Sequence, residues 1–477
     1  YESACKNTAH PPLYLTLFGM FLSLFFQDHF TKWSGELFNL IFYVISIVVF
    51  YDLSSRFFRN RSVALFSSFL YGISIAVVSC TLFIRPYSML LCSSIAFMDI
   101  HISMLDNKNR WLPHTKIKSY FALIFCFLVG AATHYYFLVF AFFICLGYGI
   151  VLLFINKKRL VLEYIFILSI SLSLYYVLWP NFYRDLLFGY RGTEAISNLT
   201  TFSSGFFSRI NYYSKMLNTY LFGGLVRYYL LLLLALIILK SIINCYYKIS
   251  NTHFHKNVSV NVTVRRIANI YRSNLHGQMI FIIIFASVCY FLLIAKIAPP
   301  MPYGNVIFME LRYFSCIFPC IILVLIDCVD YSTKQVLKSK RIRLLMNVFL
   351  AVIVIFGYIF PGVDYLYKGA ERHLDILDNY AQDRAVFITD VTYYCSNLNV
   401  YFSKNVAVYQ TDTEGITQLS KAFDGLDEPE IILYIDSERR DKYKVLESVY
   451  TRLNATDCRF LFETAGLHRA DVYVLNI

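Results

Sequence analysis

The sequence predicts a polytopic α-helical membrane protein that ends in a small α/β domain outside the membrane. Of its 477 residues, 58% are hydrophobic and only 16% are charged, whereas soluble domains carry nearer a quarter charged residues. Apolar stretches recur along the chain at close to the ~20 residues that cross the ~30 Å hydrocarbon core of a bilayer. This pattern stops after residue 361. The three observations together define the fold class.

Ten of the apolar stretches are candidate spans, and one earlier stretch is not. Residues 12–27 are apolar but make only about 16 residues, short for a span, so we expect a juxtamembrane or re-entrant helix there. Pro11 and Pro12 suit the start of that helix, because the first turn does not use the missing N–H. The candidate spans are residues 36–54, 62–83, 86–105, 119–133, 135–155, 162–179, 223–245, 278–297, 313–329 and 344–361.

The basic residues between the spans all agree with one orientation. Loops rich in Lys and Arg alternate with loops that are poor in them, and cytoplasmic loops carry this excess. The net charge of +12 is therefore a sign of topology, and we expect no nucleic-acid partner. We place residues 1–35, the turns at Arg85 and His134, and the tail outside the cytoplasm, with the spans in the plasma (inner) membrane. The basic loops are residues 56–61, 107–118, 156–159, 248–272 and 334–343.

The chain is expected to divide into three regions. Residues 1–35 are the remnant of a first exterior loop with its juxtamembrane helix, residues 36–362 form the membrane domain, and residues 363–477 form the exterior α/β domain. In that tail, strand-like segments alternate with amphipathic helical ones, a β-α-β pattern. It has no G-x-G-x-x-G and no P-loop, so we expect a structural or acceptor-binding module. The sequence leaves open whether Cys395 and Cys458 form a disulfide. The expected strands are 384–389, 405–411, 430–436, 459–464 and 471–477, and the helices are 413–426 and 437–454.

Polar residues gather at the predicted outer ends of the spans. Arg85 and Tyr87 lie in "FIRPYSML", His134 in "GAATHYYFLVF", and Arg312 and Tyr313 in "FMELRYFSCIFP". Arginine suits phosphate because its planar fork donates two parallel hydrogen bonds. Each residue also has a structural explanation, since a lone arginine can extend to the interface and a histidine can simply cap a turn. Their placement on one side favours a site for a lipid-linked phosphate.

The spans themselves contain few charged residues. Asp99 and His101 are the main exception, with Asp327 similarly placed toward the cytoplasmic half of its span. An ion-coupled transporter is expected to carry ionisable groups near the middle of the membrane, at broken helices. Packing that satisfies these side chains explains them better, while a coupling role stays open.

Four segments together resemble a known family. "AHPPLYLTLF", then "IRPYSMLL", "THYYFLVF" and "ELRYFSCIFP" resemble, in this order, motifs of the C-type (GT-C) integral-membrane glycosyltransferases. The match is to the bacterial branch related to protein O-mannosyltransferases and the lipid A aminoarabinose transferase. The resemblance covers the whole spanning region, and the exterior tail has counterparts in the family. It implies transfer of a hexosyl or pentosyl group from a polyprenyl-phosphate donor to an acceptor at the outer membrane face. The residues that it implies for the donor phosphate are His10, Arg85, Tyr87, His134, Arg312 and Tyr313.

The resemblance also implies an acidic residue in the first exterior loop, which acts as a base or orients the acceptor. The family places this acid some tens of residues before the proline pair, so we expect the given chain to begin inside the loop, with one more span and the main acid upstream. Glu2 is the acid that remains and is the candidate catalytic residue. Thr8 stands where many relatives carry Asp. No metal ligands are predicted, and dependence on a divalent metal stays undecided.

The acceptor is left open as a glycan, a lipid or a protein, and membrane lipid is the further expected partner. Two functions from other classes remain as alternatives. A transporter or flippase of lipid-linked saccharides would move the carrier across the bilayer without forming a glycosidic bond. A non-catalytic membrane protein would use its tail to bind cell-surface glycans. Consumption of a polyprenyl-phosphate sugar separates the three.

Overall fold

The structure is a computed structural model, and it forms two compact units, residues 1–363 and 364–477. Each unit is described by itself. The residues described are 11–26, 32–107, 113–200, 206–232, 234–235, 238, 274–297, 311–336, 339–359, 362–363, 369–380, 384–390, 401, 407–419, 430–437, 439–464 and 469–477.

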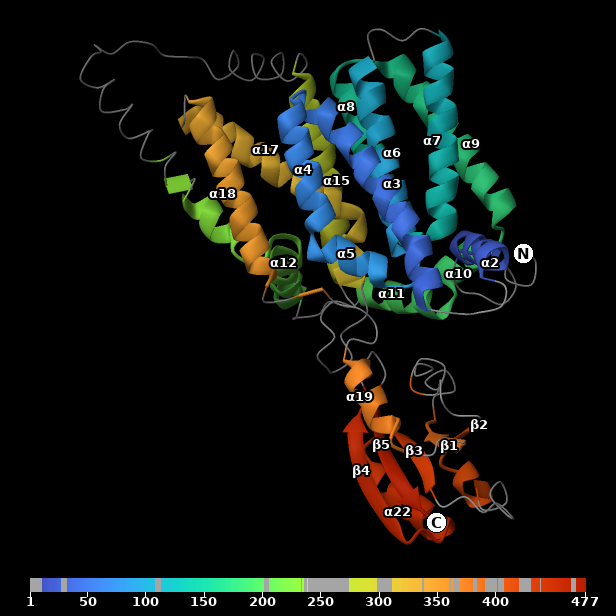
Figure 1. The fold of residues 1–477 in the computed structure, drawn as a ribbon. Coiled ribbons are helices and arrows are strands. Elements are labelled where there is room, and N and C mark those ends of the chain that lie inside the picture. Colours follow the sequence, from blue (N-terminus) through green and yellow to red (C-terminus); the bar gives the residue numbers. More distant parts are fainter. Residues whose placement is uncertain are drawn as a thin grey trace, which may run out of the picture. The chain divides into compact units, whose positions relative to one another are not determined.

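The first unit is built from helices. Its long helices pack against one another, α3 with α4 and α6, α6 with α7, α7 with α9, and α8 with α15. The short helices α2, α5, α10 and α11 lie together at one end of this bundle (Figure 1). The elements are α2 (Leu13–Phe25), α3 (Lys32–Phe58), α4 (Arg61–Ile73), α5 (Ile75–Leu82), α6 (Tyr87–Asn107), α7 (Pro113–Thr133), α8 (Tyr135–Phe154), α9 (Lys158–Leu178), α10 (Phe182–Leu187), α11 (Tyr190–Thr200), α12 (Phe206–Phe222), α15 (Leu275–Ile297), the 3-10 helix η1 (Arg312–Ile317), α17 (Phe318–Val336) and α18 (Lys340–Tyr358).

The prediction of a multi-pass membrane protein is confirmed. In the described part of the chain, seven helices are long and apolar enough to cross a membrane. The predicted span 62–83 is broken, because α4 and α5 meet at Ser74 with a bend of 49°. The last predicted span, 344–361, includes a shorter apolar helix, Leu344–Tyr358, and the predicted span 223–245 lies partly outside the described residues. Helix α2 has 13 residues, about 20 Å of helix, and its placement at the membrane surface stays a prediction.

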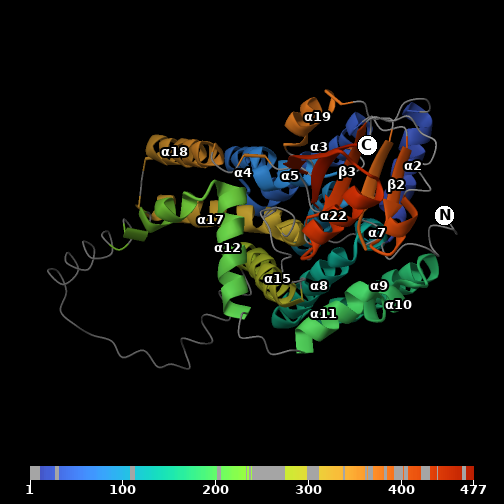
Figure 2. The same ribbon diagram turned by 90° about the horizontal axis from the view of Figure 1, so that it is seen from below.

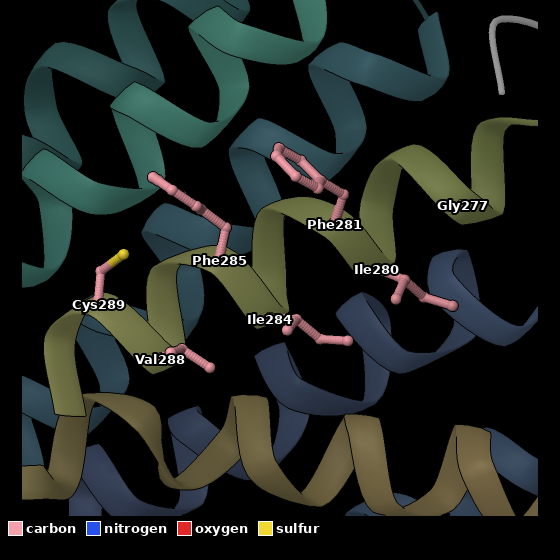
Figure 3. A pocket seen from close by; sticks show the side chains of 7 residues that line it. All are labelled: Gly277, Ile280, Phe281, Ile284, Phe285, Val288 and Cys289. Carbon is pink, nitrogen blue, oxygen red and sulfur yellow. The ribbon is translucent and has the colours of Figure 1, made fainter. Parts of the chain in front are cut away.

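One face of α15 shows the character expected of a lipid-facing surface. Side chains at helical spacing line an apolar groove of about 470 Å³ along this face (Figure 3). Its lining presents no charged group, so hydrocarbon is the medium that suits it. The lining residues are Gly277, Ile280, Phe281, Ile284, Phe285, Val288 and Cys289.

The ionisable residues of the spans have partners. Asp99 forms an ion pair with Arg56, whose Nε lies 3.4 Å from the carboxylate Oδ1. The two ring nitrogens of His101 lie 2.7 Å from the Phe97 carbonyl and 2.7 Å from the Tyr164 hydroxyl. Asp327 pairs with His276 at 2.8 Å. These contacts support the structural explanation of the three residues.

The second unit is an α/β domain with a mixed five-stranded sheet, so the expected fold class is confirmed. The strand order is β2-β1-β3-β5-β4, in which β1 pairs in parallel with β2 and β3, while β5 is antiparallel to β3 and β4. Helix α19 packs on one face of the sheet and α22 on the other (Figure 2). The elements are α19 (Ala370–Leu377), β1 (Arg384–Ile388), β2 (Ala407–Thr411), the 3-10 helix η3 (Gly415–Gln418), β3 (Glu430–Asp436), α22 (Lys442–Arg452), β4 (Asp457–Glu463) and β5 (Ala470–Asn476).

Arg439 joins the loops that follow the three parallel strands. Its guanidinium donates to Asp390 after β1 at 2.9 Å, to Thr413 after β2 at 2.6 Å, and to Asp441 at 3.1 Å. The carboxyl ends of parallel strands are where open α/β sheets commonly bind ligands, but here these groups bond one another and act as a cross-link. Cys458 carries a free thiol, and Cys395 lies outside the described residues.

Candidate functional site

Three turns that are distant in the sequence meet at one end of the helical unit. The first joins α5 to α6, the second joins α7 to α8 at His134, and the third is η1, which begins at Arg312. Element η1 packs against α5, α6 and α8, which brings the third turn onto the other two. The residues predicted from separate motifs therefore belong to a common structural cluster.

The guanidinium of Arg312 lies at the centre of this cluster, among aromatic rings. Its central carbon is 5.2 Å from the ring centroid of Phe83, 5.5 Å from that of Tyr87 and 5.1 Å from that of Tyr313. Distances under about 6 Å allow cation–π attraction. One guanidinium nitrogen also donates to the Tyr313 hydroxyl at 3.4 Å. The rings orient the planar fork of Arg312 without cancelling its formal charge.

His134 directly precedes α8 as its N-cap and is held in one tautomer. Its Nδ1 accepts a hydrogen bond from the backbone N–H of Tyr136 at 3.1 Å, so the side chain acts as the N-cap of the helix. A nitrogen that accepts cannot carry the proton, so the neutral ring carries its hydrogen on Nε2. The ring of His134 lies 5.5 Å from that of Tyr87 and 4.8 Å from that of Tyr136. His134 therefore presents a donor nitrogen beside the Arg312 cluster.

Aromatic contacts that we did not predict close the cluster. Tyr136 packs edge-on against Tyr313, with centroids 5.3 Å apart. Tyr290, from α15, donates its hydroxyl to the Tyr313 carbonyl at 2.7 Å and so fixes the start of η1. The ring of Phe83 lies against the guanidinium of Arg312. The chain contains 44 Phe and 39 Tyr, and this abundance hides the few that surround Arg312.

Arg85 is exposed in the turn between α5 and α6. Its backbone N–H donates to the Phe83 carbonyl at 2.6 Å, which makes this turn tight. Phe83 and Tyr87, two residues before and after it, both contact Arg312. The structure thus places Arg85 next to the cluster in the chain while its side chain stays accessible. Glu2 and His10 lie outside the described residues.

The chemistry of the described cluster suits an anion. It combines arginine, a histidine donor and tyrosine hydroxyls, and arginine matches the geometry of phosphate. Among the described residues, no group of three or more His, Cys, Asp and Glu side chains could hold a metal ion.

Fold and site together define a multi-pass membrane protein with an arginine surrounded by aromatic rings at the ends of its spans, and with a C-terminal α/β unit. Among solved structures, the chain is similar in fold to ArnT from Cupriavidus metallidurans bound to undecaprenyl phosphate. The identity is 10% and the TM-score 0.50, over 98% of this chain and 88% of that one. The apo state of the same protein matches at 10% identity, 98% and 87% coverage and a TM-score of 0.47. No family model and no curated protein sequence matches the chain.

Proposed function

We propose that the protein is a membrane glycosyltransferase that takes a sugar from a polyprenyl-phosphate donor and transfers it to an acceptor at the outer membrane face. The proposal includes a plasma-membrane location with the α/β unit outside the cytoplasm. The fold shared with ArnT, whose solved complex contains undecaprenyl phosphate, supports a lipid carrier.

The observation that carries the proposal is the arginine held by three ring faces at the end of the spans. A buried or interfacial cation is costly in a membrane protein and marks function more often than it stabilises the fold. Arg312 lies where α6, α8 and η1 meet, and the ring of Tyr87 contacts both Arg312 and His134. An anionic group at the lipid surface is the ligand that this arrangement fits.

In the proposed reaction, a nucleophilic atom of the acceptor forms a bond to the anomeric carbon of the sugar. The bond between that carbon and the carrier phosphate oxygen breaks, and its electron pair stays on the phosphate. Arg312 stabilises the growing negative charge because its donors are already oriented before the reaction. His134 Nε2 and the tyrosine hydroxyls donate to the same oxygens, and Arg85 adds charge from the exposed turn. The acceptor's proton passes to an acid of the first exterior loop, for which Glu2 is the candidate.

The test uses the whole protein, reconstituted in vesicles with a polyprenyl-phosphate sugar. Mass analysis of the lipid fraction measures loss of the donor and appearance of free polyprenyl phosphate. We expect Arg85→Ala to abolish transfer while the protein stays folded. Wild-type turnover in this variant would remove Arg85 from the site, and movement of intact lipid-linked sugar across the bilayer would identify a flippase instead.

A further inference from the structure

A single buried asparagine connects the short helix α2 with the turn that carries Arg85. Asn39, in α3, is fully buried. Its side-chain oxygen accepts from the Tyr14 hydroxyl at 3.0 Å. Its side-chain nitrogen donates to the carbonyls of Thr81 at 3.0 Å and Phe83 at 2.9 Å. Its own backbone carbonyl accepts from the Ser88 hydroxyl at 2.8 Å.

These bonds hold the turn between α5 and α6 from both sides. The last carbonyls of a helix have no partner within it. Asn39 supplies one for Thr81 in α5 and adds a second donor to the carbonyl of Phe83, the C-cap, which also accepts from the Arg85 N–H. Ser88 is the second residue of α6, so its bond to α3 fixes the start of the next helix. Arg85 lies between these anchors, and the ring of Phe83 is one of the three around Arg312.

Helix α2 is docked on the same part of α3. Tyr14, Phe18 and Phe21 surround the ring of Phe38, with centroid distances of 5.5, 5.4 and 5.3 Å. Phe38 is the residue directly before Asn39, so the aromatic packing places the Tyr14 hydroxyl at the asparagine. Tyr14 itself is 3% exposed. Helix α2 is therefore tied through Tyr14 and Asn39 to the Arg85 turn.

We propose that Asn39 is a positioning residue that couples α2 to the turn carrying Arg85. This inference rests on the proposed function for its catalytic meaning. In the proposed reaction the turn brings Arg85 to the donor phosphate. Asn39 then sets the position of this turn, and breaking its bonds loosens the turn without touching any group that contacts the substrate.

The experiment measures the same variants by hydrogen exchange and by transfer in reconstituted membranes. Tyr14→Phe removes only the hydroxyl that reaches Asn39. Asn39→Asp keeps the acceptor for Tyr14 and loses both donors to the α5 carbonyls. The matched control is Tyr43→Phe, one helical turn further along α3, which also removes one interhelical tyrosine bond, to the Gly72 carbonyl of α4 at 2.5 Å.

We expect Tyr14→Phe to raise amide exchange in residues 83–88 about tenfold, the effect of losing one buried hydrogen bond. Asn39→Asp should raise it further and lower kcat at least tenfold with a smaller change in KM for the donor. Tyr43→Phe should leave exchange in residues 83–88 at the wild-type level.

Two results would overturn the coupling. One is equal exchange in residues 83–88 for Tyr14→Phe and Tyr43→Phe, and the other is wild-type kcat in Asn39→Asp. The proposed function fails separately, if the wild-type protein consumes no polyprenyl-phosphate sugar. In that case exchange in Tyr14→Phe still decides whether α2 and the turn are coupled.

Discussion

Replacing Arg312 by lysine tests the site most directly, because the charge is kept and the planar fork is lost. A charged hydrogen bond contributes about 1.5–3 kcal/mol, and stacking of a guanidinium on a ring adds about 0.5–1 kcal/mol. Lysine has no second parallel donor and no plane to lie on the rings of Phe83, Tyr87 and Tyr313. A loss of roughly 2–4 kcal/mol in the transition state lowers kcat/KM roughly 30- to 700-fold, at about 1.4 kcal/mol for each factor of ten.

The assay is donor consumption in vesicles, with melting temperature measured on the same preparation. Arg227→Lys is the matched control, because Arg227 also lies over a ring, 4.7 Å from the centroid of Tyr228, and donates to its hydroxyl at 2.7 Å. This pair is exposed, so transfer by the control should stay at the wild-type level. Transfer by Arg312→Lys within threefold of wild type, in a folded protein, would refute the role of the oriented fork.

Three further perturbations have defined outcomes. In His134→Asn, the new side chain can still cap α8, so we expect transfer to fall at least tenfold with an unchanged melting temperature, whereas His134→Ala should also lose about 1 kcal/mol of stability. Gly357→Ala brings a methyl group against the Gly223 carbonyl oxygen and should lower the free energy of unfolding by about 1–3 kcal/mol. In Gly149→Ala the new methyl group meets no atom within 4 Å, so the midpoint of thermal unfolding should stay unchanged or rise. Partial burial raises the pKa of Asp390, but hydrogen bonds from Thr413 and Arg439 outweigh it and lower this pKa below its ordinary value. The sheet should therefore lose stability as the pH falls from about 4. In Asp390→Asn, the protection of β1 amides from hydrogen exchange should depend less on pH than in the wild type. An unchanged pH dependence would exclude a contribution of Asp390 to the stability of the sheet.

Hydrophobic pattern and charge were enough to predict the fold class, because both act over whole segments. The five expected strands overlap β1 to β5, since period-two alternation and β-branched residues are properties of each segment alone. The break at Ser74 was not predicted. Residues 62–83 are apolar throughout, and the bend of 49° depends on how α4 and α5 pack against α3, which no local pattern encodes.

The candidate site was predictable in its polar members and hidden in its aromatic ones. Arg85, His134 and Arg312 interrupt apolar runs, so each is visible from the sequence. Phe83 and Tyr136 resemble the many aromatic residues of any lipid-facing helix, and only their contacts with Arg312 and Tyr313 distinguish them. Asn39 is a similar case. A lone asparagine in a span predicts no particular role from the sequence, and its bonds to the Thr81 and Phe83 carbonyls are visible only in the structure.

The two ends of the helical bundle hold their cations in different ways. At the end predicted to face the cytoplasm, carboxylates accept from the cations: Arg59 pairs with Asp106 at 2.8 Å, and Lys116 bonds Glu163. A carboxylate cancels the charge that it stabilises, which suits a structural role. At the other end, ring faces attract Arg312 through their quadrupoles and add no negative charge of their own. Rings also tolerate the apolar surroundings of a span end better than a carboxylate does. An aromatic enclosure is therefore a physically reasonable way to hold an arginine at the membrane surface while keeping it suited to an arriving phosphate.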